Sequence, residues 1–254
     1  MSRPTNSVLV IDDNVDLAEN IAEILEDFGV DAQLATDATQ ALARFGDRAW
    51  SLVVTDVRMP GIDGLELLSL IKQRSPGTPV LVMTGYADRD TVTRAHHSGA
   101  LAVVNKPLDL DAFLELVERI AAANESVLIV EDDIALCGNL TDILCEECGV
   151  LPHPAASVAL ARRLAAVVDF KAALIDLRLP DGNGLALARE LTRRADGSPR
   201  PVLVMTGYPE ELAVGAETSA ARSGEPSDAV PDGVVVITKP FPVPILLERL
   251  RLLV

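Results

Sequence analysis

Polar residues that could handle a phosphoryl group occur in two matching sets, and each of them follows a short apolar run. The first set comprises Asp12, Asp13, Asp56, Thr84 and Lys106. The second set comprises Glu131, Asp132, Asp176, Thr206 and Lys239. In open α/β sheets, ligands bind beyond the carboxyl ends of the strands. If the apolar runs are strands, each set is therefore expected to converge on one rim of a sheet.

The residue types in each set suit phosphoryl transfer. Three carboxylates a few ångströms apart repel one another and raise one another's pKa values unless a cation neutralises them. An oxygen-only site of carboxylates, a backbone carbonyl and water suits Mg²⁺. A lysine ammonium and a threonine hydroxyl could then hold the phosphoryl oxygens, since such transfer is mainly positioning and charge neutralisation. On this interpretation Asp56 and Asp176 are nucleophiles that form an acyl phosphate.

The two sets belong to two copies of one unit. The octapeptide PVLVMTGY at 79–86 returns letter for letter at 201–208. A period of about 120 residues is far longer than a solenoid repeat, so the chain is interpreted as two domains, 1–123 and 124–254. The segment from Thr206 to Lys239 is longer than its counterpart in the first copy. Its Gly-, Ser-, Pro- and Glu-rich stretch at 215–233 predicts an insertion, with a displaced or shortened fourth helix.

The apolar runs alternate with amphipathic helical patterns in both copies. The predicted strands are 8–11, 52–55, 80–83 and 101–104, then 127–130, 173–175, 202–205 and 234–237, with a weaker strand near Leu151. Such runs are typical of parallel strands that are covered on both faces. An apolar stripe from Leu17 to Phe28 predicts the first helix. The alternation predicts an α/β fold with doubly wound parallel sheets, joined by a short linker at 122–126 that fixes the two domains relative to each other.

Net charge, apolar run length and cysteine content indicate which classes of protein the chain does not fit. A formal charge of −16 and a pI near 4.5 argue against direct nucleic-acid binding. The N-terminus lacks the apolar region of a signal peptide and no apolar run reaches about 18 residues, so a soluble, cytoplasmic protein without membrane contact is expected. Cys137, Cys145 and Cys148 are interpreted as free thiols, since a closed zinc site needs four ligands. The three histidines, His96, His97 and His153, are interpreted as solvated or half-buried.

The motifs DVRMPGIDG at 56–64, DLRLPDGNG at 176–184 and Lys-Pro at 106–107 and 239–240 resemble the receiver domains of two-component response regulators. The resemblance implies two tandem (βα)5 flavodoxin-like domains with parallel strand order 2-1-3-4-5. It also implies that the strand-end aspartate accepts phosphate from a phosphohistidine of a sensor histidine kinase or phosphotransfer protein. The implied Mg²⁺ sites lie at the acid pairs Asp12-Asp13 and Glu131-Asp132, with Asp13, Asp56 and the Arg58 carbonyl as ligands in one copy and Asp132, Asp176 and the Arg178 carbonyl in the other.

One departure from the family pattern concerns the output. Receivers usually carry Tyr or Phe three residues before the lysine, a ring that moves inward when the Thr or Ser hydroxyl engages phosphate. These positions are Val103 and Val236 here. Phosphorylation can still shift a two-state equilibrium, but the usual rotamer switch cannot carry the signal.

The resulting expectation is a tandem receiver protein without an output domain. It would accept phosphate on Asp56 and Asp176, act on a downstream protein target through protein contacts, and not be an enzyme in the ordinary sense. Three alternatives stay open: a pseudo-receiver adaptor that is never phosphorylated, the receiver end of a hybrid histidine kinase, and a haloacid-dehalogenase-like phosphatase. The last would need a second Asp where Arg58 and Arg178 stand. The cognate kinase, the target and the oligomeric state, with a homodimer among the options, are left open.

Overall fold

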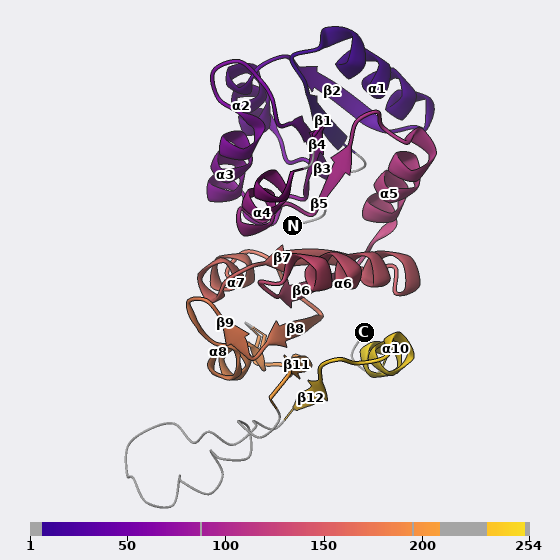
Figure 1. Cartoon of the computed structure of the whole chain (residues 1–254). Helices are drawn as coiled ribbons and strands as arrows, with labels where there is room; N and C mark the ends of the chain where they lie inside the picture. The colour runs from indigo at the N-terminus through magenta and orange to yellow at the C-terminus, as the bar shows by residue number, and fades with distance from the viewer. Residues whose placement is uncertain (1–6, 87, 195, 209–232, 252–254) are drawn as a thin grey trace, which may run out of the picture.

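The chain forms two α/β units, one after the other along the sequence (Figure 1). The computed structural model describes residues 7–86, 88–194, 196–208 and 233–251. Each unit is built on a parallel five-stranded sheet with helices on both faces.

The first unit alternates strands and helices throughout its length. Its elements are β1 (Ser7–Ile11), α1 (Val15–Asp27), β2 (Asp31–Ala35), α2 (Ala38–Asp47), β3 (Leu52–Asp56), α3 (Gly64–Arg74), β4 (Val80–Thr84), α4 (Arg89–His97), β5 (Ala102–Asn105) and α5 (Leu110–Ala122). The strand order is β2-β1-β3-β4-β5, all parallel. Apolar side chains of α1 and α5 form a core on one face of the sheet, and those of α2, α3 and α4 form a core on the other.

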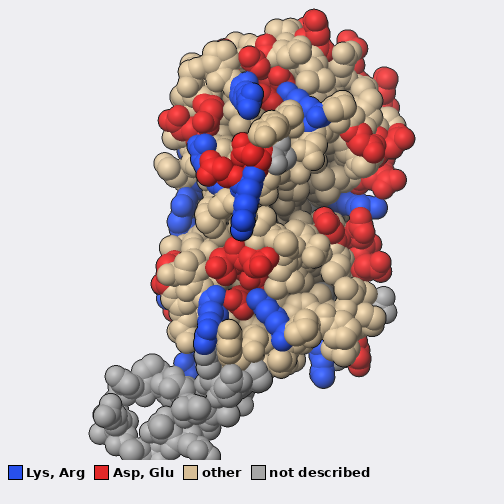
Figure 2. Space-filling model, viewed as in Figure 1, with Lys and Arg blue, Asp and Glu red and all other residues tan. Residues whose placement is uncertain are grey.

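The second unit repeats this arrangement. Its elements are β6 (Ser126–Val130), α6 (Ile134–Glu147), β7 (Leu151–Ala155), α7 (Val158–Ala165), β8 (Ala172–Asp176), β9 (Arg178–Leu179), β10 (Gly182–Asn183), α8 (Gly184–Leu191), β11 (Val202–Thr206), β12 (Val234–Thr238) and α10 (Val243–Arg251). Read from its β7 edge, the sheet runs β7-β6-β8-β11-β12, so both sheets have the flavodoxin-like order 2-1-3-4-5. Figure 2 shows acidic side chains on the visible face of both units, in keeping with the net charge of −16.

Aspartates fix the starts of the helices that lead away from the rim. Asp37, Asp63 and Asp88 accept hydrogen bonds from the third residue beyond them, at 2.8, 2.8 and 2.7 Å. Such caps satisfy a backbone N–H that has no partner within the helix. The cap therefore sets where the chain turns from each strand-end loop into its helix.

The structure confirms the predicted strands with small shifts and corrects several details. The edge strand β2 was not predicted, because its sequence DAQLA mixes exposed polar residues with buried alanines. Phe28 does not continue the apolar stripe of α1: it lies beyond the last helical residue, and 55% of its surface is exposed. The short antiparallel pair β9 and β10, between β8 and α8, is not among the predicted strands. The predicted insertion and the fourth helix of the second copy fall almost wholly outside the described residues.

The two units are in contact along the β5 edge of the first and the β7 edge of the second (Figure 1). Helix α4 packs against α6 and β7, and α5 packs against α6. Arg119 pairs with Glu146 at 3.1 Å, and the Arg163 guanidinium donates to the Lys72 carbonyl at 2.8 Å. Only residues 123–125 separate α5 from β6. The two units are therefore held together by packing between their helices as well as by the short linker.

No helix within the described residues is long and apolar enough to cross a membrane. The three cysteines are free thiols, as predicted. Cys137 and Cys145 lie on the buried side of α6, and burial raises the pKa of each thiol to about 12.

A close backbone approach at Gly64 gives a first prediction. A Cβ at this position would lie 1.9 Å from the Asp56 carbonyl oxygen, so Gly64→Ala forces the start of α3 away from β3. We expect a loss of about 3 kcal/mol in the free energy of unfolding, measured by urea titration. The control is Gly138→Ala in α6, where nothing lies within 4 Å of the added carbon and helix propensity favours alanine by about 1 kcal/mol. Equal stability of the two variants would contradict this account.

The buried amine of Lys72 gives a second prediction. Burial lowers the pKa of Lys72 to about 7, while its Nζ donates to the carbonyls of Pro76 and Thr78 at 3.2 and 2.8 Å. The unfolded chain holds this proton up to about pH 10.4. Between these pH values the unfolded state binds more protons, so stability should rise with pH, by up to about 1.4 kcal/mol per unit. Lys72→Met should reduce that slope in denaturant titrations, whereas Lys171→Met, at a partly exposed lysine paired with Glu125, should leave it unchanged.

Candidate functional site

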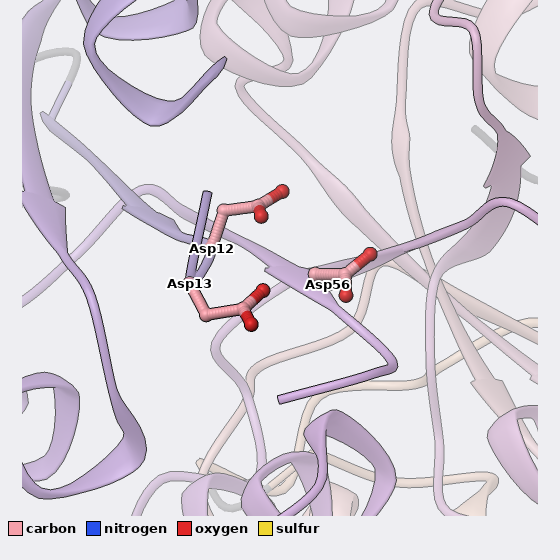
Figure 3. A group of neighbouring side chains, drawn as sticks. All are labelled: Asp12, Asp13 and Asp56. Carbon is pink, nitrogen blue, oxygen red and sulfur yellow. The ribbon is translucent and has the colours of Figure 1, made fainter. Parts of the chain in front are cut away.

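The first set of polar residues meets at the carboxyl ends of β1, β3, β4 and β5. Asp12 and Asp13 follow β1, and Asp56 is the last residue of β3. Their carboxylates lie on the same side of the strand ends (Figure 3), with one oxygen from each within 4.8 Å of the others. Asp12 and Asp56 are buried and Asp13 is exposed. The predicted convergence is therefore present, with one acid open to solvent.

Lys106 neutralises part of this charge. Its Nζ lies 2.6 Å from Asp12 Oδ2 and 2.6 Å from Asp56 Oδ1. Burial alone would lower the pKa of Lys106, but its hydrogen bonds to the two carboxylates outweigh burial and raise it above the ordinary value. The ammonium thus stays charged. Three carboxylates and one ammonium leave two uncompensated negative charges at the rim.

The neighbouring backbone also turns toward the rim. The Arg58 N–H donates to Asp56 Oδ2 at 2.8 Å, so the loop after β3 folds back over the acceptor carboxylate. The buried Thr84 hydroxyl donates to the Tyr86 carbonyl at 3.0 Å and accepts from the Tyr86 N–H at 3.1 Å. Thr84 therefore holds the start of the loop that leads to α4. A phosphoryl oxygen could take the place of the Tyr86 carbonyl as the acceptor of the hydroxyl proton.

The second set forms the same constellation at the ends of β6, β8, β11 and β12. Glu131, Asp132 and Asp176 again place one carboxylate oxygen each within 4.8 Å of the others, and only Asp132 is exposed. Lys239 Nζ lies 2.7 Å from Glu131 Oε2 and 2.9 Å from Asp176 Oδ1. The hydrogen bonds to these acids outweigh burial and raise the pKa of Lys239. Thr206 Oγ1 accepts from the Tyr208 N–H at 2.9 Å.

Three features distinguish the second site from the first. Burial raises the pKa of Glu131, and the hydrogen bond from Lys239 opposes that shift without cancelling it. The Arg178 guanidinium lies over the Tyr208 ring, 3.8 Å from the ring centroid. Asp181, in the β9–β10 turn, accepts the N–H groups of Val158 and Ala159 at the start of α7, at 2.8 and 2.9 Å. The loop after the acceptor aspartate is thus tied down in the second unit.

The residues present at each rim fit Mg²⁺. The donors are all oxygens, which is the ligand type that Mg²⁺ prefers over nitrogen or sulfur. The two uncompensated negative charges at each rim match one divalent cation. The one exposed acid in each trio, Asp13 or Asp132, leaves a side open for the water ligands that Mg²⁺ retains.

The structure corrects the interpretation of two histidines. His96 was expected to be solvated or half-buried; it is 8% exposed, and its Nε2 lies 2.9 Å from the Glu131 carbonyl oxygen of the other unit. Burial lowers the pKa of its imidazole. His153 is buried as well, with its Nε2 3.2 Å from Ser126 Oγ and its ring edge-on to Phe170. No local sequence pattern distinguishes a helical histidine that contacts another domain from one that does not. The contact between His96 and Glu131 could therefore not be predicted from the sequence.

The first unit matches a known domain family. Residues 8–118 match the response regulator receiver domain. Among solved structures, a response regulator receiver protein from Pseudomonas putida is 31% identical, with 47% of this chain and 98% of that chain covered and a TM-score of 0.44. The receiver domain of NtrX from Brucella abortus is 38% identical, with 45% and 97% covered and a TM-score of 0.43.

Curated relatives extend the likeness beyond the first unit. The transcriptional regulatory protein ZraR of Klebsiella oxytoca is 31% identical over 81% of this chain, but the alignment spans only 44% of that protein. A response regulator receiver protein of Anaeromyxobacter sp. (strain Fw109-5) is 38% identical over 202 residues, which are 80% of this chain and 83% of the relative. With a receiver domain matched in its first unit and a relative aligned across most of both lengths, the chain belongs to the response regulator receiver family.

Proposed function

We propose that the chain is a tandem receiver that accepts phosphoryl groups on Asp56 and on Asp176. The observation that carries this proposal is the repeated constellation of three clustered carboxylates, one bridging lysine and one buried threonine at both rims. A structural role alone would not require an excess of two negative charges beside a buried strand end, because such charge costs folding free energy. This destabilising cluster of charges occurs at both rims, which supports a function in phosphoryl transfer.

The proposed transfer uses the side chains as follows. An Asp56 carboxylate oxygen attacks the phosphorus of a phosphohistidine, a P–O bond forms as the donor's P–N bond breaks, and the donor imidazole leaves. The Lys106 ammonium moves from the two carboxylates to a phosphoryl oxygen, where it stabilises the developing charge. The Thr84 hydroxyl turns from the Tyr86 carbonyl to another phosphoryl oxygen. Both groups already lie at the rim where the phosphoryl group would arrive.

Asp13, Asp56 and the Arg58 carbonyl would hold Mg²⁺ in the first unit, beside the buried Asp12. In the second unit the holders would be Asp132, Asp176 and the Arg178 carbonyl, beside Glu131. The ion would supply charge neutralisation for the carboxylates and for the phosphoryl oxygens. Asp12 and Glu131 instead receive the lysine ammonium, at 2.6 and 2.7 Å, which frees the exposed acids for the metal.

The expected phosphoryl donor and the expected downstream target are inferred from membership of the receiver family. A histidine kinase or a phosphotransfer protein is the expected donor, and a downstream protein is the expected target. Some relatives, such as ZraR of Klebsiella oxytoca, are named as transcriptional regulators. Within this chain the net charge of −16 favours protein contacts over direct contact with nucleic acid. The chain would catalyse only its own phosphorylation and dephosphorylation, so it is not proposed as an enzyme.

Removal of each acceptor tests the assignment directly. With Mg²⁺ and acetyl phosphate or phosphoramidate, intact-mass measurement should show up to two phosphoryl additions on the wild type. Asp56→Ala should remove one addition and Asp176→Ala the other, because each variant lacks one nucleophile. Peptide mapping should place the remaining group on the unchanged aspartate.

A wild type that stays unmodified with every donor would overturn the proposal and leave the adaptor interpretation. Additions that persist in the doubly substituted chain would show that other residues are the acceptors. Turnover of a free phosphomonoester would instead favour the phosphatase alternative.

The metal requirement gives a separate prediction. Asp13→Ala removes the exposed acid of the first trio, so phosphorylation of Asp56 should slow by about 100-fold or more at a fixed Mg²⁺ concentration, while Asp176 is still modified. The control is Asp27→Ala, which removes the same charge from the exposed end of α1, away from the rim. The measurement is the rate of acyl phosphate formation with and without a chelator. Equal rates for the two variants would show that the acid trio does not bind the required ion.

A further inference from the structure

One hydrogen bond joins the first unit directly to the acid pair of the second. His96 Nε2, near the end of α4, lies 2.9 Å from the carbonyl oxygen of Glu131, and both residues are buried. A carbonyl can only accept, so Nε2 is the donor. We propose that His96 is a positioning residue that couples the two acidic rims, so that the state of one site changes the metal affinity of the other. This inference rests on the proposed function, because it requires that both rims bind a divalent cation.

On the second rim, Glu131 is held at four points. Its N–H donates to the Ala155 carbonyl at 3.0 Å, and its carbonyl accepts from His96. Its carboxylate accepts from Lys239 at 2.7 Å and from the Asp133 N–H at 3.2 Å. The exposed acid Asp132 follows directly in the chain. Because His96 holds the peptide group between these two residues, its removal would free the direction in which the Asp132 side chain points. Ligand direction matters because Mg²⁺ demands near-octahedral geometry.

On the first rim, α4 is connected to the Thr84 hydroxyl. Thr84 holds both the N–H and the carbonyl of Tyr86, and two residues later Asp88 caps α4 through the Thr91 N–H at 2.7 Å. If the hydroxyl turns to a phosphoryl group on Asp56, it releases the Tyr86 carbonyl. The loop that leads to α4 then loses the hydrogen bond between the Thr84 hydroxyl and the Tyr86 carbonyl. His96 lies on this same helix, two turns further on.

The contact between the units leaves α4 room to move. A pocket of about 310 Å³ lies between α4 and β5 on one side and α6 on the other, and its lining includes Val92, His96, Val103, Ile134, Cys137 and Asp142. A fully packed interface would resist a shift of α4, whereas an open pocket beside it permits a second arrangement of the helix. Coupling between two sites requires an element with two arrangements whose equilibrium both sites shift, and α4 meets this requirement if it contacts both rims. Such coupling is reciprocal.

The test measures Mn²⁺ binding to the second rim by calorimetry, with Mn²⁺ as a probe that accepts the same oxygen ligands as Mg²⁺. The full chain carries Asp13→Ala, so that the first rim does not contribute. His96→Leu in this background should weaken Mn²⁺ binding about fivefold, because the hydrogen bond to Glu131 is lost. His96→Gln, whose amide can donate to the same carbonyl, should recover part of the affinity. His97→Leu is the matched control, because His97 is the exposed neighbour on the same helix, and it should leave affinity unchanged.

A double-mutant cycle tests the coupling itself. Thr84→Ala frees Tyr86 without touching the second rim, and it should change Mn²⁺ affinity there about threefold or more when His96 is present. In the His96→Leu chain the same substitution should have no effect. Circular dichroism and urea titration of each variant show whether the chain is folded. If His96→Leu does not fold, the same cycle is measured with His96→Gln in its place.

Three outcomes separate this inference from the function on which it rests. If Asp132→Ala abolishes Mn²⁺ binding but His96→Leu and His96→Gln bind as the parent does, the second rim is a metal site and the coupling proposal is overturned alone. Additive effects of Thr84→Ala and His96→Leu overturn it in the same way. If Mn²⁺ binding survives Asp132→Ala, the proposed function of the second unit is overturned, and the coupling with it.

Discussion

Each rim holds more negative charge than its lysine neutralises, and the strand ends around it must accommodate that charge. Two acids of each trio are buried, and burying charge costs several kcal/mol per ion unless it is paired. The lysine repays part of this cost by contacting both buried acids. The remaining charge favours a divalent cation at the rim, because such an ion would relieve the repulsion among the carboxylates.

The strand order explains how distant residues reach one rim. β1 and β3 are hydrogen-bonded neighbours, so the acids after Ile11 and at Asp56 come from adjacent strand ends. β4 and β5 follow in register, which places Thr84 and Lys106 beside them. Gly64 lets α3 begin against the Asp56 carbonyl, and Gly184 does the same at Asp176. The geometry of each site is thus set by backbone packing, and the side chains need only be of the right type.

Most of this could be predicted from the sequence, because strand ends and polar residues are both local signals. The apolar runs marked β1, β3, β4 and β5, and the pattern recurred in the second copy, so the convergence of the acids followed from general rules of parallel sheets. The misses have physical reasons as well. The edge strand β2 lacks a continuous apolar run. The His96 contact depends on how two folded units pack, which no local pattern encodes.

The packing of the units also bears on how a signal could leave the first rim. Val103 stands where the family usually has a large ring, and it lines the pocket between α4, β5 and α6 instead of filling it. Helix α4 contacts α6 and β7 of the second unit, so this side of α4 is occupied within the chain. If the proposed coupling holds, a change at Asp56 that moves α4 would also alter the contact with α6 and β7. In the proposed coupling the second unit would thus respond to the first, and the small side chain at Val103 leaves space beside α4 for that response.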